Sequence, residues 1–115
     1  MLRLSRADFH ARFPRPNPGE HFTQARNVLI VDRDMSVDGV VQDLIVRAGA
    51  KVLITGLVER SLTVDRDAIV YVDGLIDGRA TVDGALCVDG GHVGRSLSGS
   101  GIVFDPTEPA DSEIG

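Results

Sequence analysis

The sequence predicts an all-β protein, a three-sided parallel β-helix with about 18 residues per turn. The first observation is a run of nine β-branched aliphatic residues spaced six apart, namely Val40, Val46, Val52, Val58, Val64, Val70, Ile76, Val82 and Val88. The second lies two places before each of these anchors, where side-chain size repeats after eighteen residues as Leu44, Ala50, Gly56, then Leu62, Ala68, Gly74. The third is the composition, because four Phe, one Tyr, no Trp and thirteen Gly suit a narrow aliphatic core with many turns.

Each side of the coil is predicted to be one short strand, such as 44–46 or 62–64. Residues i and i+2 of a strand share a face, so the anchor and the residue two places before it both point inward. Strands of successive turns then pair in parallel, over about three to four turns. An eighteen-residue repeat places Leu62 beneath Ala80 and Ala68 beneath Leu86, an exchange that conserves core volume.

Three segments are predicted from this pattern. Residues 28–104 form the β-helix, and residues 105–115 form an acidic C-terminal tail. Residues 1–27 lie outside the repeat and form a capping or flexible segment, which carries Phe9, Phe13 and Phe22. Its alternating prolines, at 14, 16 and 18, exclude helix and sheet there, whereas residues 5–12 can form one or two helical turns. Packing against the coil, contact with a membrane and disorder remain alternatives for this segment.

One outer side of the coil is predicted to be unusually apolar, and a monomer rarely exposes so large a patch. Two interpretations remain open: the N-terminal phenylalanines pack on it, or another chain docks there. The candidate interface residues on this outer side and at the last turn are Met35, Leu53, Leu57, Tyr71, Leu75, Val93, Ile102 and Phe104.

The charge distribution and the cysteine count restrict the partners and the compartment. The net charge is −5, yet residues 1–26 carry +3 and the remainder −8, so an acidic body argues against binding nucleic acid. Cys87 is the only cysteine, which excludes an internal disulfide and favours a reducing compartment. No apolar run approaches the ~20 residues of a membrane span, so we expect a cytoplasmic protein.

We find no pattern that predicts catalysis, a cofactor or a metal. His10, His21 and His92 have no second ligand at a recognisable metal spacing, and no phosphate-binding glycine loop occurs. Cys87 is expected to face outward without a basic neighbour that would activate it. Acyltransferases and carbonic anhydrases with a six-residue period need histidines within the repeat, but none occurs between residues 22 and 91. A non-enzyme is therefore expected.

The stretch from Leu44 to Gly90 resembles the bactofilins, polymer-forming bacterial cytoskeletal proteins. The similar motifs are the triplets 62–64, 68–70, 80–82 and 86–88 and the Asp-Gly corners at 73–74 and 77–78. The resemblance implies a right-handed three-sided β-helix and assembly end to end, without nucleotide, into filaments that act as scaffolds.

Two functions follow as expectations. The first is a structural scaffold that self-associates through the open ends of the β-helix, an assembly that can extend into filaments. The alternative is a small acidic binding module, such as an immunity or adaptor protein, that uses the apolar outer face to bind a protein partner.

Overall fold

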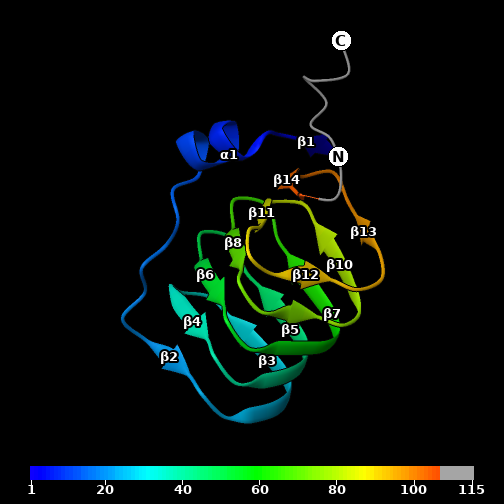
Figure 1. The fold of residues 1–115 in the computed structure, drawn as a ribbon. Coiled ribbons are helices and arrows are strands. Elements are labelled where there is room, and N and C mark those ends of the chain that lie inside the picture. The colour runs from blue at the N-terminus through cyan, green and yellow to red at the C-terminus, as the bar shows by residue number, and fades with distance from the viewer. Residues whose placement is uncertain (107–115) are drawn as a thin grey trace.

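The computed structural model describes residues 1–106 and shows a parallel β-solenoid of about five turns, with 51% of these residues in strands and one short helix (Figure 1). This confirms the predicted fold class. The elements in chain order are β1 Leu2–Arg3, α1 Arg6–Arg12, β2 His21–Phe22, β3 Ala25–Val31, β4 Met35–Val37, β5 Val40–Val46, β6 Lys51–Ile54, β7 Leu57–Val64, β8 Ile69–Val72, β9 Leu75–Ile76, β10 Arg79–Val82, β11 Ala85–Val88, β12 His92–Val93, β13 Leu97–Ser98 and β14 Ile102–Phe104. The prediction of three to four turns is wrong, because the coil already begins with β2 and β3.

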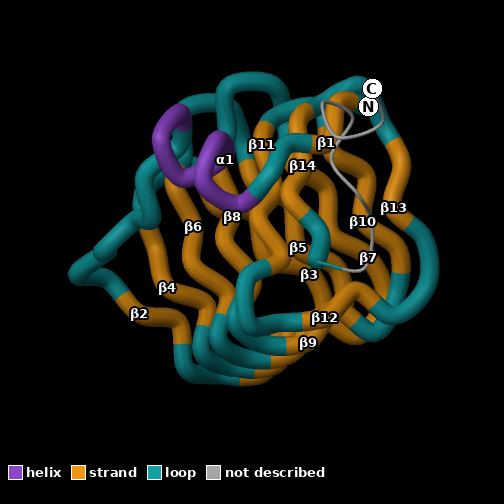
Figure 2. Tube along the Cα trace, turned by 45° about the horizontal axis from the view of Figure 1, so that its top comes forward, coloured by secondary structure: helices purple, strands orange, loops and turns teal. Residues whose placement is uncertain are grey.

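The coil has three sides, which two sheets form. Side 1 is one sheet with the strand order β1-β14-β11-β8-β6-β4-β2. The second sheet bends around a corner, so that the long strands β5 and β7 cross both remaining sides. In later turns they are replaced by separate strands: the start of β7 pairs with β9 on side 2, and its end pairs with β10 on side 3. The stacked corners of successive turns are visible in Figure 2.

The core confirms eight of the nine predicted anchors, since every one from Val46 to Val88 is buried. Val40 is the exception, because its side chain is exposed and the neighbouring Val41 is buried instead. The cause is a register irregularity in β5 between Val41 and Asp43, which displaces the inward position by one residue.

The number of residues per turn varies, and this changes which side chains stack. Lys51 pairs with Ile69, eighteen residues later, whereas Ile69 pairs with Ala85, sixteen residues later. The corner between β7 and β8 takes four residues, 65–68, but the corner between β10 and β11 takes only two, 83–84. Leu62 therefore lies beneath Ala80 as predicted. The prediction that Ala68 lies beneath Leu86 is wrong.

The residue beneath Leu86 is Val70. The predicted outward placement of two interface residues is also wrong, again because the number of residues per turn varies. Met35 pairs with Val52 and is buried in the core, while its neighbour Ser36 takes the position beside Leu53. Val93 pairs with Ile76 and packs against the core. A constant eighteen-residue spacing thus misplaces side chains at both ends of the coil, where the turns are shorter.

The N-terminal residues are an ordered part of the fold. α1 begins after Ser5, whose hydroxyl accepts a hydrogen bond from the Asp8 amide. β1 pairs with β14, so the start of the chain adds a strand to the last turn on side 1. The coil also begins before residue 28, since β2 pairs with β4 and β3 pairs with β5. Residues 107–115 of the predicted acidic tail lie outside the described residues.

Within residues 1–106, no helix combines the length and the apolar character that crossing a membrane requires.

Candidate functional site

The outer face of side 1 is covered by residues 4–20, which we call the N-terminal strap. Phe9 on α1 is fully buried together with Tyr71, Ala85 and Cys87, which point outward from the coil. The Phe9 ring lies 5.1 Å from the Phe13 ring and 5.7 Å, edge-on, from the Tyr71 ring. The interpretation that N-terminal phenylalanines pack on this side is confirmed for Phe9 and Phe13. Phe22 packs instead against the inner core.

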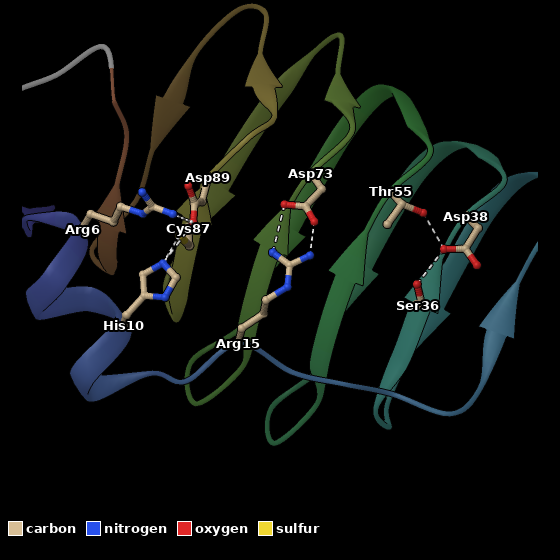
Figure 3. Close-up of polar contacts among 9 residues, drawn as sticks. All are labelled: Arg6, His10, Arg15, Ser36, Asp38, Thr55, Asp73, Cys87 and Asp89. Carbon is tan, nitrogen blue, oxygen red and sulfur yellow. Dashed lines mark hydrogen bonds and ion pairs between the residues drawn. The ribbon is translucent and has the colours of Figure 1, made fainter.

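The strap is matched to the coil by charge as well as by apolar contact (Figure 3). Asp89, Asp73 and Asp38 follow the ends of β11, β8 and β4, at one corner of three turns. Each aspartate pairs with the segment that runs past it: Arg6 and His10 with Asp89, Arg15 with Asp73, and His21 with Asp38. The basic start and the acidic body of the sequence are therefore partners within one molecule.

Asp38 lies at the centre of a small hydrogen-bond network at the β2 end of this corner. Its carboxylate accepts hydrogen bonds from Ser36 Oγ at 2.6 Å, from Thr55 Oγ1 and from His21 Nδ1 at 2.7 Å. Burial alone raises the pKa of this carboxyl, but the three hydrogen bonds outweigh it and hold the pKa below its usual value. Asp38 is thus ionised and holds His21, the residue that directly follows the strap.

A second polar cluster lies where α1 meets β11. His10 Nε2 lies 3.1 Å from Asp89 Oδ2 and 3.9 Å from Cys87 Sγ, and Arg6 also reaches Asp89. One ring nitrogen of His10 thus faces both the thiol and the carboxylate. A nucleophilic relay needs one ring nitrogen on the thiol and the other on the carboxylate, so this arrangement does not match one.

The thiol itself is poorly suited to nucleophilic attack. Burial, together with the nearby Asp89 carboxylate, raises the pKa of Cys87 to about 12, so the thiol is neutral at physiological pH. The prediction that Cys87 lies on the surface without a basic neighbour is wrong, because the thiol is buried and His10 lies beside it. The Cys87 side chain points outward from the coil as expected, but α1 covers it completely. Sequence spacing could not show this cluster, because 77 residues separate His10 from Cys87.

The remaining predicted interface residues fall into two groups. Tyr71 is buried beneath the strap, and Leu53, Ile102 and Phe104 are partly buried around the same cluster. Leu57 and Leu75 lie on the outer face of side 2, where Leu75 is exposed and the strap does not reach. Most of the predicted partner surface is therefore occupied by the chain itself, and partner binding at Leu57 and Leu75 stays a prediction.

Comparison of the chain with protein-family models, with curated proteins and with solved structures found no match. The likeness to bactofilins therefore stays a prediction.

Tyr71→Phe is expected to reduce the loss of folding stability that occurs at alkaline pH. The Tyr71 hydroxyl donates a hydrogen bond to the Phe13 carbonyl, and burial raises its pKa from 10.0 to about 12. Unfolded chains lose this proton first, so the stabilisation is complete below pH ~10 and is lost as the pH rises towards about 12. The variant should lose about 1 kcal/mol at neutral pH and should show a shallower decline between these pH values. Urea unfolding of both proteins across this range measures it, and parallel pH profiles would contradict the assignment.

Proposed function

We propose that this protein is a non-enzymatic structural scaffold that self-associates through the end of the coil formed by β3. The observation that carries the proposal is an unpaired strand edge. β3 has seven residues and, among residues 1–106, pairs only with β5. Its other edge presents backbone N–H and C=O groups, which are a template for pairing with another strand.

The two ends of the coil differ in how well they are protected. At the far end, β1 covers β14 on side 1, and the last strands of sides 2 and 3, β12 and β13, have only two residues each. Short terminal strands and an added strand are common ways of protecting an edge. At the near end, β3 is long, and its outward Val28 and Ile30 are 49% and 53% exposed. β3 is therefore the most favourable surface for a second copy of the chain.

Pairing of β3 with β3 of a second copy would extend the sheet of sides 2 and 3 across the contact. Two copies related by a two-fold axis would place their β3 strands antiparallel, and each would contribute Val28 and Ile30 to the shared surface. Growth beyond this pair into a filament would require a second contact at the β12–β13 end. We also propose a cytoplasmic location, which the single cysteine, Cys87, and the predicted resemblance to bactofilins support.

The double variant Val28→Lys/Ile30→Lys is expected to convert a self-associating protein into a monomer. Two ammonium groups on each β3 would face those of the second copy, and like charges on paired strands are destabilising. Light scattering over a concentration series, with electron microscopy for filaments, measures assembly. Thr81→Lys is the matched control, because Thr81 is exposed and lies in the same outward column as Ile30, three turns away from the edge. A wild-type protein that stays monomeric at all concentrations would overturn the proposal.

A binding module is the second candidate function, and one surface favours it. Val40, Leu57 and Leu75 form an outward apolar column on side 2, in which Val40 and Leu75 are exposed. A partner there would bury this column against the acidic body. Leu75→Asp discriminates between the two functions, because it should abolish partner binding and leave β3-mediated assembly unchanged.

A further inference from the structure

We propose that His10, Cys87 and Asp89 bind one divalent transition-metal ion of the zinc type, which fastens α1 to β11. α1 supplies the His10 ligand, β11 supplies Cys87, and Asp89 follows directly after β11. The three ligand atoms, Nε2, Sγ and a carboxylate oxygen, all lie within 4.8 Å of one another (Figure 3). The site is separate from the β3 edge and does not depend on self-association.

The spacing of the donor atoms fits a tetrahedral site. Zinc bonds of ~2.0–2.3 Å to nitrogen, oxygen and sulfur place neighbouring ligands about 3.4–3.6 Å apart. Here Nε2 lies 3.1 Å from Asp89 Oδ2 and 3.9 Å from Cys87 Sγ. Movements of a few tenths of an ångström would bring these two contacts to the required spacing, and the pair formed by Cys87 Sγ and the Asp89 carboxylate, which lies within 4.8 Å, would have to close by up to about 1 Å. The mixed nitrogen, sulfur and oxygen set favours zinc over calcium or magnesium, which prefer oxygen ligands alone.

The surroundings hold the ligands in place and leave a route for the ion. The His10 ring packs edge-on to Tyr71 at 5.2 Å, and Phe9, one residue earlier, anchors the helix. Cys87 is fully buried, whereas the His10 and Asp89 side chains are 33% and 20% exposed. An ion would therefore enter from the α1 side, and water would complete its fourth position.

Arg6 provides a further test of the proposal, because its positive charge beside Asp89 disfavours a bound cation. Its guanidinium lies 3.2 Å from Asp89 Oδ2, and its side chain is 67% exposed, so it can turn into solvent when an ion binds. On binding, the metal replaces two protons: the thiol proton of Cys87, which passes to solvent, and the Nε2 proton that His10 donates to Asp89, which passes to solvent while Nδ1 holds the ring's remaining proton. The metal then takes the lone pair of His10 Nε2 and one oxygen of Asp89. No electron transfer is involved. If the cluster is only a structural ion pair, removing Arg6 should weaken it. If the cluster is a metal site, removing Arg6 should tighten metal binding.

Cobalt(II), added to the reduced, metal-stripped full-length chain, tests the proposal. We expect one ion per chain and a sulfur-to-cobalt charge-transfer band that zinc displaces. Cys87→Ser should abolish the band, and His10→Gln and Asp89→Asn should each weaken binding at least about tenfold, as even outer-shell changes do. Arg6→Gln should tighten binding several-fold. His21→Gln is the matched control, since His21 forms a similar pair with Asp38 but has no cysteine nearby, and it should leave cobalt binding unchanged.

Circular dichroism of each variant shows whether it is folded, and His10→Gln and Arg6→Gln change partly exposed side chains that the core does not need. A folded wild-type chain without the charge-transfer band would overturn the proposal. Equal cobalt affinity in wild type, His10→Gln and Asp89→Asn would also overturn it, because the thiol would then bind alone. Weaker binding by Arg6→Gln would assign the cluster to an ion pair.

Discussion

Val64→Asp is expected to leave the chain unfolded. Val64 is completely buried in the middle of the coil, where β7 pairs with β5 on one side and β10 on the other. The flanking side chains in its column are Val46 and Val82, which offer a carboxylate no hydrogen bond. Burying an unpaired charge costs several kcal/mol, and a domain has about 5–15 kcal/mol of stability in total. Circular dichroism and thermal melting of the purified variant measure the effect.

Thr63→Asp is the matched control for this variant. Thr63 is the preceding residue in the same strand and points to the outside of the coil. Thr63→Asp therefore places the same carboxylate on the outer surface. The control is expected to fold and to lose at most about 1 kcal/mol. Folding of both variants with equal melting temperatures would refute the inward assignment of Val64.

Gly56→Ala is expected to destabilise the coil by about 3 kcal/mol, the upper end of the usual cost of overpacking. Gly56 stacks on Gly39 at the corner between sides 1 and 2, and a Cβ on Gly56 would lie only 2.0 Å from the Gly39 carbonyl oxygen. The turns cannot move apart locally, because the next amide, that of Leu57, donates a 3.0 Å hydrogen bond to the same carbonyl. The methyl group would therefore break this ladder or displace a whole corner, and urea unfolding measures the loss.

Gly19→Ala provides the comparison. Gly19 lies in the strap, and a Cβ there would meet no atom within 4 Å. Its substitution should change the free energy of unfolding by no more than about 0.5 kcal/mol. Similar losses for both variants would show that the glycine column at this corner is not a close backbone contact.

The sequence pattern predicted the coil because a buried strand position tolerates little except an aliphatic side chain. Val46 to Val88 therefore repeat visibly along the chain. The pattern does not show corner length, because it marks only the inward strand positions, which corners of two or of four residues can equally join. The two-residue corner before Ala85 shifted the register, and the misassignments of Met35, Val93 and Leu86 all follow from such shifts.

The strap was only partly predictable. Its phenylalanines and its positive charge indicated a covering segment, and an apolar outer face indicated what it covers. The partner of each residue could not be found, because Arg15 meets Asp73 and His10 meets Cys87 across more than half of the chain. Such contacts depend on the path of the proline-containing stretch, for which no periodicity exists.

The pairing of β1 with β14 has a consequence for how the protein is made. Leu2 hydrogen-bonds to Gly101, so β1 can form its contacts only after β14, much later in the sequence, has been synthesised. The middle turns can stack one after another during translation, since each needs only its predecessor. Until β11 has joined β8 and α1 packs on both, the apolar residues around Tyr71 and Cys87 stay uncovered, so chaperones can bind this face of the nascent chain.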